Sequence, residues 1–173
     1  MVTIRPATLQ DVEGLARVHV DTWRTTYRGL IPADYLAGLT YEPRLRMWTQ
    51  ILNRAAEHNF VFVAVGEAGQ VVGFISGGPE RSNHAVYKGE LYAIYILADQ
   101  QGQGIGRELV RVLSRSLIQA GFSSMLVWVL DGNPAQHFYL RLGGQYIASK
   151  PEQIGGAELT ELAYGWPDLH TLL

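Results

Sequence analysis

The chain of 173 residues contains no cysteine. This absence excludes disulfide bridges, thiolate metal sites and a cysteine nucleophile, and it fits a cytoplasmic protein. The five histidines have no zinc-like spacing, so we expect no metal site. No apolar run approaches the length of a membrane-spanning helix, and residues 1–6 lack the apolar core of a secretion signal. We therefore expect a cytoplasmic protein with no membrane partner.

Charged residues are scarce, at 17% of the chain, and the formal net charge is −2. A protein that binds nucleic acid needs a basic face, so this balance argues against a nucleic-acid partner. It is better suited to a cationic or neutral small substrate. Hydrophobic residues make up 47% of the sequence, which is enough for one domain with a substantial core. We expect residues 1–173 to form that single domain.

Three common catalytic or nucleotide-binding motifs are missing. The dinucleotide fingerprint Gly-x-Gly-x-x-Gly fails, because its last position falls on Arg107 when counted from Gly102 and on Leu109 when counted from Gly104. No Gly-Lys-Ser/Thr triplet of a nucleotide-hydrolase loop occurs, and no Gly-x-Ser-x-Gly elbow of a serine hydrolase occurs. A nucleotide-phosphate enzyme is therefore disfavoured, although the glycine-rich turn described next keeps it as an alternative.

The most informative stretch is residues 90–113. Residues 90–97 are apolar, aromatic and β-branched, which predicts a mostly buried strand. Three alternate glycines follow, Gly102, Gly104 and Gly106, and apolar residues then recur at helical spacing. A turn without Cβ atoms that opens a helix presents unpaired N–H groups and the positive end of the helix dipole. Because these features favour a bound phosphate, we interpret this turn as an anion site.

Other elements follow from periodicity and turn residues. We expect a first strand at 2–5, a helix at 9–25, short helices near 33–39 and 41–52, and a strand hairpin at 60–65 and 71–76. A loop should cover residues 77–89, a strand 124–129, a helix should start at Pro134, and two strands should lie at 145–149 and 158–164. This order predicts an α/β (α+β) fold with one mixed sheet and helices on both faces.

The pattern Gln-x-x-Gly-x-Gly, read on Gln101, Gly104 and Gly106, resembles the acyl-CoA pyrophosphate loop of the GNAT superfamily of N-acetyltransferases. About 30 residues later, residues 133–144 resemble the family segment Asn-x-x-Ala-x-x-Phe-Tyr-x-x-x-Gly-Phe, with Gly144 in place of the last Phe. Residues 3–7 also look like the family opening, so the similarity covers almost the whole chain. It implies a mostly antiparallel sheet of six to seven strands.

The resemblance implies that acetyl-CoA is the cosubstrate and lies between the strands at 90–97 and 124–129. The pantetheine amides would pair with the backbone of Ile94, Tyr95 and Ile96. The side chain of Asn133 would hold the pantetheine arm or cap the following helix, and Phe138 lies in the second motif. The residues implied for the pyrophosphate are Gln101, Gly102, Gln103, Gly104, Ile105, Gly106 and Arg107.

The family chemistry implies direct acetyl transfer to a primary amine. An amine of pKa near 10 is mostly protonated at neutral pH, so a base must remove its proton, and Glu90 is the candidate. The N–H near Ile96 would stabilise the oxyanion, and Tyr139 would protonate the departing thiolate. Trp23, Tyr27, Trp128 and the loop at 77–89 are candidates for the acceptor pocket, although Trp23 and Tyr27 are equally consistent with core packing.

Several alternatives stay open. A non-catalytic acyl-CoA-binding or sensor module would keep the glycine turn but show no turnover. His84 and His137 have no paired ligand and are interpreted as surface or packing residues. The aromatic C-terminal residues Tyr164 and Trp166 point to a homodimer. The acceptor is expected to be a small-molecule or peptide amine, and the sequence does not identify it.

Overall fold

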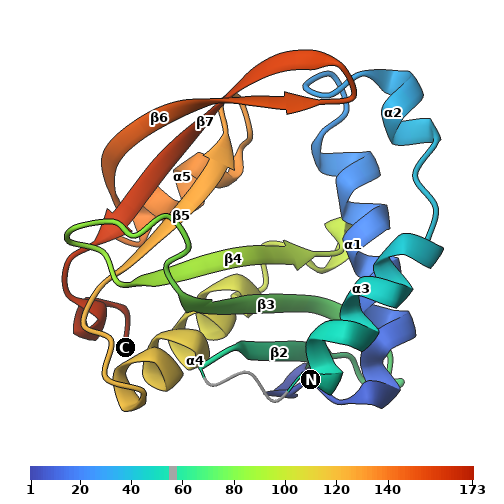
Figure 1. Cartoon of the computed structure of the whole chain (residues 1–173). Coiled ribbons are helices and arrows are strands. Elements are labelled where there is room, and N and C mark those ends of the chain that lie inside the picture. The colour runs from blue at the N-terminus through green and yellow to red at the C-terminus, as the bar shows by residue number, and fades with distance from the viewer. Residues whose placement is uncertain (55–57) are drawn as a thin grey trace.

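The computed structural model describes residues 1–54 and 58–173. Its strands are β1 (Thr3–Pro6), β2 (Phe60–Val65), β3 (Val71–Pro79), β4 (Gly89–Ile96), β5 (Met125–Leu130), β6 (Gln145–Ile154) and β7 (Ala157–Trp166). Its helices are α1 (Val12–Thr26), α2 (Ala33–Ala37), α3 (Glu42–Asn53), α4 (Ile105–Gln119) and α5 (Ala135–Arg141), with short 3-10 turns η1 (Leu9–Asp11), η2 (Ala98–Gln100) and η3 (Leu169–Leu172). Figure 1 shows these elements along the chain.

The seven strands of the described chain form one sheet in the order β1-β2-β3-β4-β5-β7-β6. Neighbouring strands are antiparallel except β4 and β5, which run parallel. The connection between β4 and β5 is helix α4, as a parallel pair requires a crossover. The expected mixed, mostly antiparallel sheet is confirmed.

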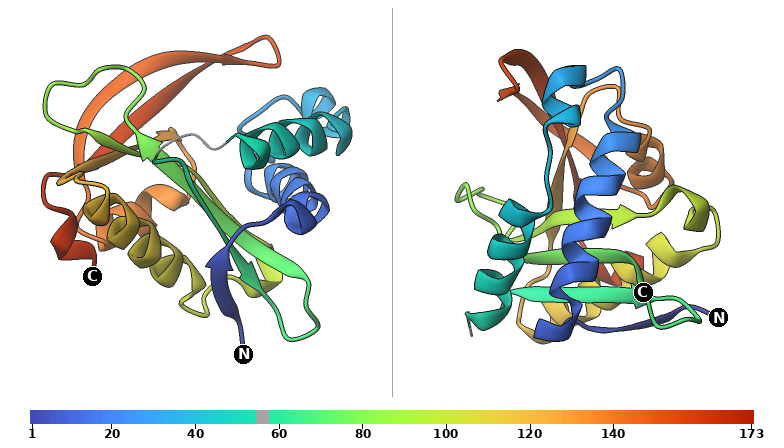
Figure 2. Two further views of the ribbon diagram at one scale, coloured as in Figure 1. Left: turned by 60° about the horizontal axis from the view of Figure 1, so that its bottom comes forward. Right: turned by 90° about the vertical axis from the view of Figure 1, so that its right-hand side faces the viewer.

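Helices cover both faces of the sheet (Figures 1 and 2). Helices α1 and α3 pack on one face of β3 and β4, and their core includes Leu15, Trp48 and Phe74. Helix α4 packs on the other face, where Leu109 and Leu113 join the larger core. We call these the α1 face and the α4 face. Side chains alternate between them along each strand, so neighbouring residues of β4 serve different faces.

The observed boundaries correct two expectations. Residues 77–79 belong to β3 and Gly89 begins β4, so the loop is shorter than the predicted 77–89. Strands β6 and β7 extend well beyond 145–149 and 158–164, because a two-residue turn at Gly155 and Gly156 joins them into a long hairpin. Both glycines have positive φ, +59° and +80°, as a type I′ hairpin turn requires.

Tyr164 and Trp166 are buried within the chain, with 5% and 1% of their surface exposed. The Trp166 indole N–H donates to the carbonyl of Leu142. These aromatic residues complete the core on the α4 face, so they supply no exposed surface for a second copy. The homodimer stays a prediction and loses the observation on which it was based.

Candidate active site

Strands β4 and β5 pair only at their first residues. Parallel pairing joins Gly89, Glu90 and Leu91 to the start of β5 and then ends. At this point β4 contains a bulge: Ser76 lies opposite Ala93 and Gly77 opposite Leu91, which leaves Tyr92 as the extra residue. A β-bulge bends its strand and disrupts the ladder. The two strands therefore separate beyond Leu91, and a gap opens in the middle of the sheet (Figure 1).

The open edge of β4 carries free backbone groups. The Leu97 N–H donates to the carbonyl of Val72 on the β3 side. Because antiparallel pairing alternates, the backbone of Tyr95 also faces β3, whereas that of Ile94 and Ile96 faces the gap. The side-chain amide of Gln101 donates to the Ile96 carbonyl at 2.9 Å, which agrees with this assignment. Of the three predicted backbone contacts, the geometry therefore fits Ile94 and Ile96, and the Tyr95 backbone points away.

The glycine-rich turn lies at the end of the same strand. Among the described residues, no protein group accepts a hydrogen bond from the backbone N–H groups of residues 102–107. Gly102 and Gly104 have φ of +76° and +84°, and a Cβ at either would meet nothing within 4 Å. Gly104 is the N-cap of α4, so the helix dipole adds to these donors. Six consecutive N–H groups are thus available to an anion.

The remaining loop residues fix this arrangement. The Ile105 side chain is 6% exposed and packs in the core, so its contribution to a ligand is its N–H group. A Cβ on Gly106 would lie 3.2 Å from the ring of Phe138, which therefore supports the first turn of α4. Arg107 is exposed and has no ion pair within the described chain. Gln103 is exposed as well and donates to the Asp99 carbonyl.

Helix α5 places the second motif beside the gap. The Asn133 side-chain oxygen accepts from the Ala135 N–H at 2.9 Å, so Asn133 caps the helix as expected. Asn133 also lines the cavity described below, where its amide nitrogen is available. The Tyr139 side chain is 4% exposed, and burial, followed by the nearby Tyr95, raises its pKa above the ordinary value. Tyr139 therefore stays protonated at neutral pH.

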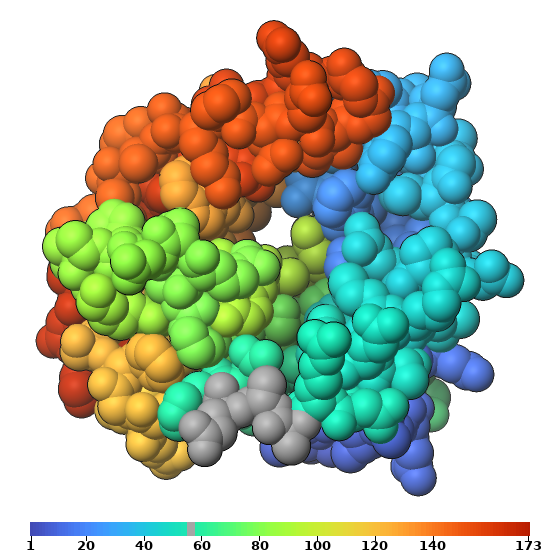
Figure 3. Space-filling view, in the orientation of Figure 1, coloured from blue at the N-terminus to red at the C-terminus, as the bar shows by residue number. Residues whose placement is uncertain are grey.

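A cavity of about 1230 Å³ runs through the gap and joins the two faces of the sheet. From the α4 face it is lined by Gly106, Phe138 and Tyr139, and from the α1 face by the predicted residues Trp23, Tyr27 and Trp128. In the space-filling view it is the hollow between the β6–β7 hairpin, β4 and the α1–α3 layer (Figure 3). Two molecules can therefore enter from opposite faces and meet at the gap.

Aromatic rings form the wall on the α1 face. Trp23 and Tyr27 pack edge to face at 4.9 Å between ring centroids, and the Tyr27 hydroxyl lies 3.5 Å from that of Tyr95. His19 of α1 is 6% exposed and lines the same cavity. Burial and the charge of Arg44 lower its pKa to about 3, so it is neutral. This wall is mostly aromatic, and Arg44, whose guanidinium lies 5.6 Å from the Trp23 ring centroid, is a cation beside it.

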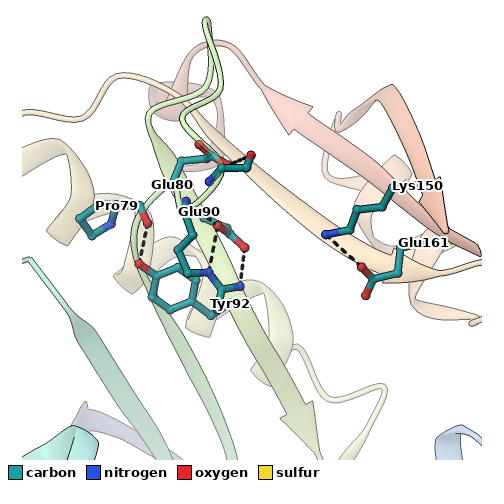
Figure 4. Close-up of polar contacts among 8 residues, drawn as sticks. Pro79, Glu80, Glu90, Tyr92, Lys150 and Glu161 are labelled. Atoms are coloured by element: carbon teal, nitrogen blue, oxygen red, sulfur yellow. Dashed lines mark hydrogen bonds and ion pairs between the residues drawn. The ribbon is translucent and has the colours of Figure 1, made fainter. Parts of the chain in front are cut away.

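Glu90 is held by a residue that the sequence did not single out. Arg81 donates to the Glu90 carboxylate from its backbone N–H at 3.1 Å, from Nε at 3.2 Å and from a terminal nitrogen at 2.6 Å. The Arg81 guanidinium also lies over the ring of Tyr92, 4.2 Å from its centroid, and the Tyr92 hydroxyl donates to the Pro79 carbonyl. Glu90 is 3% exposed. Figure 4 shows Glu90 and Tyr92 side by side in this cluster.

Opposite Glu90, the long hairpin carries a second ion pair (Figure 4). Lys150 of β6 and Glu161 of β7 are cross-strand partners whose charged atoms lie 3.3 Å apart. The Lys150 ammonium lies over the Trp128 ring at 4.1 Å. A smaller recess at the mouth of the gap is lined by residues of both pairs, by Glu80 and by Glu152. The sequence analysis included Arg81 only as part of the loop at 77–89 and did not single out Lys150 or Glu161.

The two suspected histidines have structural positions. The His84 Nδ1 accepts from the N–H groups of Val86 and Tyr87, which orders the loop between β3 and β4. His137 is exposed on α5. No group of three or more side chains able to hold a metal occurs among the described residues. None of the helices in the part of the chain that the structure describes has the length and apolar character needed to span a bilayer.

Comparison with known proteins agrees with this geometry. Residues 20–144 match the model of the acetyltransferase (GNAT) family. The N-acetyltransferase YuaI of Bacillus subtilis is 46% identical over 172 residues, which cover 99% of this chain and 96% of the relative. The PaiA N-acetyltransferase of Thermoplasma acidophilum, solved with coenzyme A, superposes with a TM-score of 0.71 at 19% identity over 94% of this chain and 98% of its own. The protein yncA of Salmonella typhimurium, solved with its cofactor acetyl-CoA, gives 0.70 at 22% identity, with coverage of 98% and 94%. The chain belongs to the GNAT family and is an acetyltransferase.

Proposed function

We propose that this protein transfers the acetyl group of acetyl-CoA directly to a primary amine of a small molecule or peptide. The observation that carries the proposal is the row of six free N–H groups at residues 102–107, placed at the end of a strand whose open edge borders a through-sheet cavity. A diphosphate needs such donors, and an extended amide chain needs such an edge. The N–H groups of the turn directly follow the open edge of β4, so one extended ligand can contact both.

In this arrangement the diphosphate accepts from the turn, and the amides of the pantetheine arm pair with Ile94 and Ile96 as an added strand does. The thioester then reaches the gap beside Tyr139. Asn133 supplies its side-chain amide to the same arm. The Gln101 and Gln103 side chains donate to carbonyls of the neighbouring backbone, so binding of the diphosphate depends mainly on the backbone N–H groups of the turn. Acetyl-CoA is the cosubstrate, and its chemistry is the activated thioester.

Transfer requires three events at the gap. The neutral amine nitrogen attacks the thioester carbon, and the charge that develops on oxygen is stabilised by a free N–H such as that of Ile96. The carbon–sulfur bond breaks and the thiolate takes a proton from the Tyr139 hydroxyl. The raised pKa of Tyr139 suits an acid that must hold its proton until the leaving group needs it.

Removal of the amine proton needs a base, and Glu90 was the first candidate. Arg81 occupies that carboxylate with three donors, so Glu90 could act only after Arg81 moves or through a water molecule. In the proposed site the clearest contribution of Glu90 is to hold Arg81 over Tyr92.

The test measures binding and turnover separately. Calorimetric titration should give saturable binding of CoA, and ATP, which tests the nucleotide-phosphate alternative, should bind much more weakly. With acetyl-CoA and a panel of amines, thiol release should require both substrates. Double-reciprocal plots should intersect, as expected for a ternary complex, whereas parallel lines would indicate an acetylated enzyme. Binding of CoA without thiol release would support the non-catalytic module instead.

A further inference from the structure

We propose that Glu161 on β7 is the carboxylate that receives the ammonium group of the acceptor and removes its proton. This inference rests on the proposed acetyl transfer to an amine and adds the residue that prepares that amine. It also identifies the acceptor class: a molecule whose reactive group is a strongly basic primary ammonium ion.

Strand register places Glu161 on the face of the sheet that borders the acceptor wall. Glu161 lies opposite Leu130 of β5 and Lys150 of β6, so these side chains share one face of the sheet. Trp128, two residues before Leu130, is on that face as well. It is the α1 face, where the acceptor wall lies. The Glu161 side chain is 20% exposed and lines both the main cavity and the recess at its mouth.

The carboxylates that line the recess differ in how many hydrogen-bond donors they already accept. Both oxygens of Glu80 accept backbone N–H groups of its own loop. Glu90 accepts three donors from Arg81. One oxygen of Glu152 accepts the N–H of Gln153. Glu161 has a single polar contact within the described chain, at 3.3 Å from Oε2 to Lys150, so no described group donates to its Oε1, and the residue lines the cavity.

The charges around Glu161 favour a cationic acceptor. Four carboxylates and two cations, Arg81 and Lys150, line the recess, so its balance is negative. Each cation is already engaged: Arg81 by Glu90, and Lys150 by Glu161 and the Trp128 ring. A positively charged acceptor is therefore attracted to the mouth, whereas an anionic one is repelled. Beyond the mouth the wall is mostly aromatic, with Arg44 beside the Trp23 ring, and its apolar surface suits the neutral amine formed after proton loss.

Each proton of the proposed reaction has a donor and an acceptor. The ammonium gives one proton to Oε1 of Glu161, and the free nitrogen pair forms the new bond to the thioester carbon. The carbon–sulfur bond breaks, and the thiolate takes the proton of Tyr139. The nitrogen, now bonded to the acetyl group, loses a second proton, which restores Tyr139 through solvent. Glu161 releases its proton to solvent, so the products are an amide, CoA thiol and one proton.

The test uses two probe acceptors with acetyl-CoA: n-butylamine, which is protonated at neutral pH, and trifluoroethylamine, which is mostly unprotonated there. Glu161→Gln should lower kcat/KM for n-butylamine by on the order of 10²-fold. It should have little effect with trifluoroethylamine, because that amine needs no base. The matched control is Glu158→Gln on the same strand, an exposed residue on the opposite face, which should leave both reactions unchanged.

A second measurement follows binding without chemistry. In the complex with CoA, the wild-type protein should bind n-butylammonium in saturation-transfer NMR, and Glu161→Gln should weaken that signal while Glu158→Gln keeps it. Equal losses for both amines, loss in Glu90→Gln with normal behaviour of Glu161→Gln, or wild-type protein without n-butylammonium binding would each overturn the inference. If wild-type protein binds no CoA, or releases no thiol with any amine, the proposed function itself fails. Calorimetric titration of Glu161→Gln with CoA distinguishes failure of the Glu161 inference from failure of the proposed function, because this variant should retain CoA affinity.

Discussion

Replacement of Gly104 by alanine tests the central binding claim, because it perturbs the diphosphate turn through the backbone alone. Gly104 has φ of +84°, and its added Cβ would meet no atom within 4 Å, so no clash with the protein arises. An L-residue in this left-handed conformation costs about 1–2 kcal/mol. The turn can lower that cost by rotating the following peptide, which redirects the Ile105 N–H away from the anion.

The magnitude follows from the number of donors disturbed. A hydrogen bond to a charged group contributes about 1.5–3 kcal/mol. Loss of one such bond should therefore raise the Kd for CoA by about 10- to 100-fold, since each 1.4 kcal/mol is about tenfold. Pantetheine, which lacks the diphosphate, should bind the wild-type protein and Gly104→Ala equally well. The effect is thus expected to be specific to the part of the ligand that the turn holds.

Gly121→Ala is the matched control. Gly121 follows the other end of the same helix, has φ of +91°, and its added Cβ would also meet nothing within 4 Å. Thermal unfolding should reveal a similar loss of stability in both variants, about 1–2 kcal/mol. Calorimetric titration should reveal weakened CoA binding in Gly104→Ala alone. The reasoning would be refuted if Gly104→Ala lost stability yet bound CoA normally, or if both variants lost affinity equally.

The remaining predictions concern chemistry and stability. Tyr139→Phe should lower kcat by on the order of 10²-fold at unchanged CoA affinity, because the ring stays and only the proton donor is lost. The rate of thiol release measures kcat, and calorimetric titration measures the CoA affinity. Gly77→Ala should destabilise the fold by about 1–3 kcal/mol in urea unfolding, since its Cβ would lie 2.7 Å from the Glu90 carbonyl oxygen. The Arg5 guanidinium lowers the pKa of Asp11 from 3.8 to about 2, so the ionised carboxylate stabilises the fold above pH 4 and this contribution is lost as the pH falls towards 2. The wild-type protein should therefore lose about 1–2 kcal/mol of unfolding free energy as the pH falls through that range, and Asp11→Asn should not. This figure allows for solvent screening at the partly exposed arginine. Acid unfolding of the two proteins measures the difference.

The glycine turn and its flanking elements were predictable because their signals are local. The strand before it is uniformly apolar, and the helix after it repeats apolar residues at helical spacing, so strand, turn and helix needed no knowledge of the rest of the chain. A cap on α5 was one of the two roles expected for Asn133, and its side-chain oxygen does accept from the Ala135 N–H. The position of Tyr139 beside the gap came only from the family resemblance.

Contacts that depend on strand register were harder to predict. Arg81 and Glu90 meet because the loop between β3 and β4 folds back, and that path is set by backbone contacts to Glu80 and His84. No periodicity encodes it. The polar end of β6 also hid its length, since Pro151 and exposed residues are tolerated on an edge strand but weaken the strand signal.

The sequence nevertheless contains a signal for one contact that was not predicted, the ion pair between Lys150 and Glu161. Gly155-Gly156 is a typical two-residue hairpin turn, and such a turn fixes the register of both strands. Counting outward from Ile154 opposite Ala157 places Lys150 opposite Glu161, as observed. The turn residues therefore already contain the register that places Lys150 opposite Glu161.

The bulge at Tyr92 links the two halves of the site. It ends the pairing of β4 with β5, so the same irregularity frees the edge at Ile94 and Ile96 and opens the cavity through the sheet. A regular strand would have left the diphosphate turn intact but isolated on the α4 face, with no route to the α1 face. In the proposed function, acetyl donor and acceptor meet because a single extra residue in β4 opens a route between the α4 face and the α1 face. Tyr92 directly follows the last pair with β5, so the bulge also sets where along β4 the proposed reaction would take place.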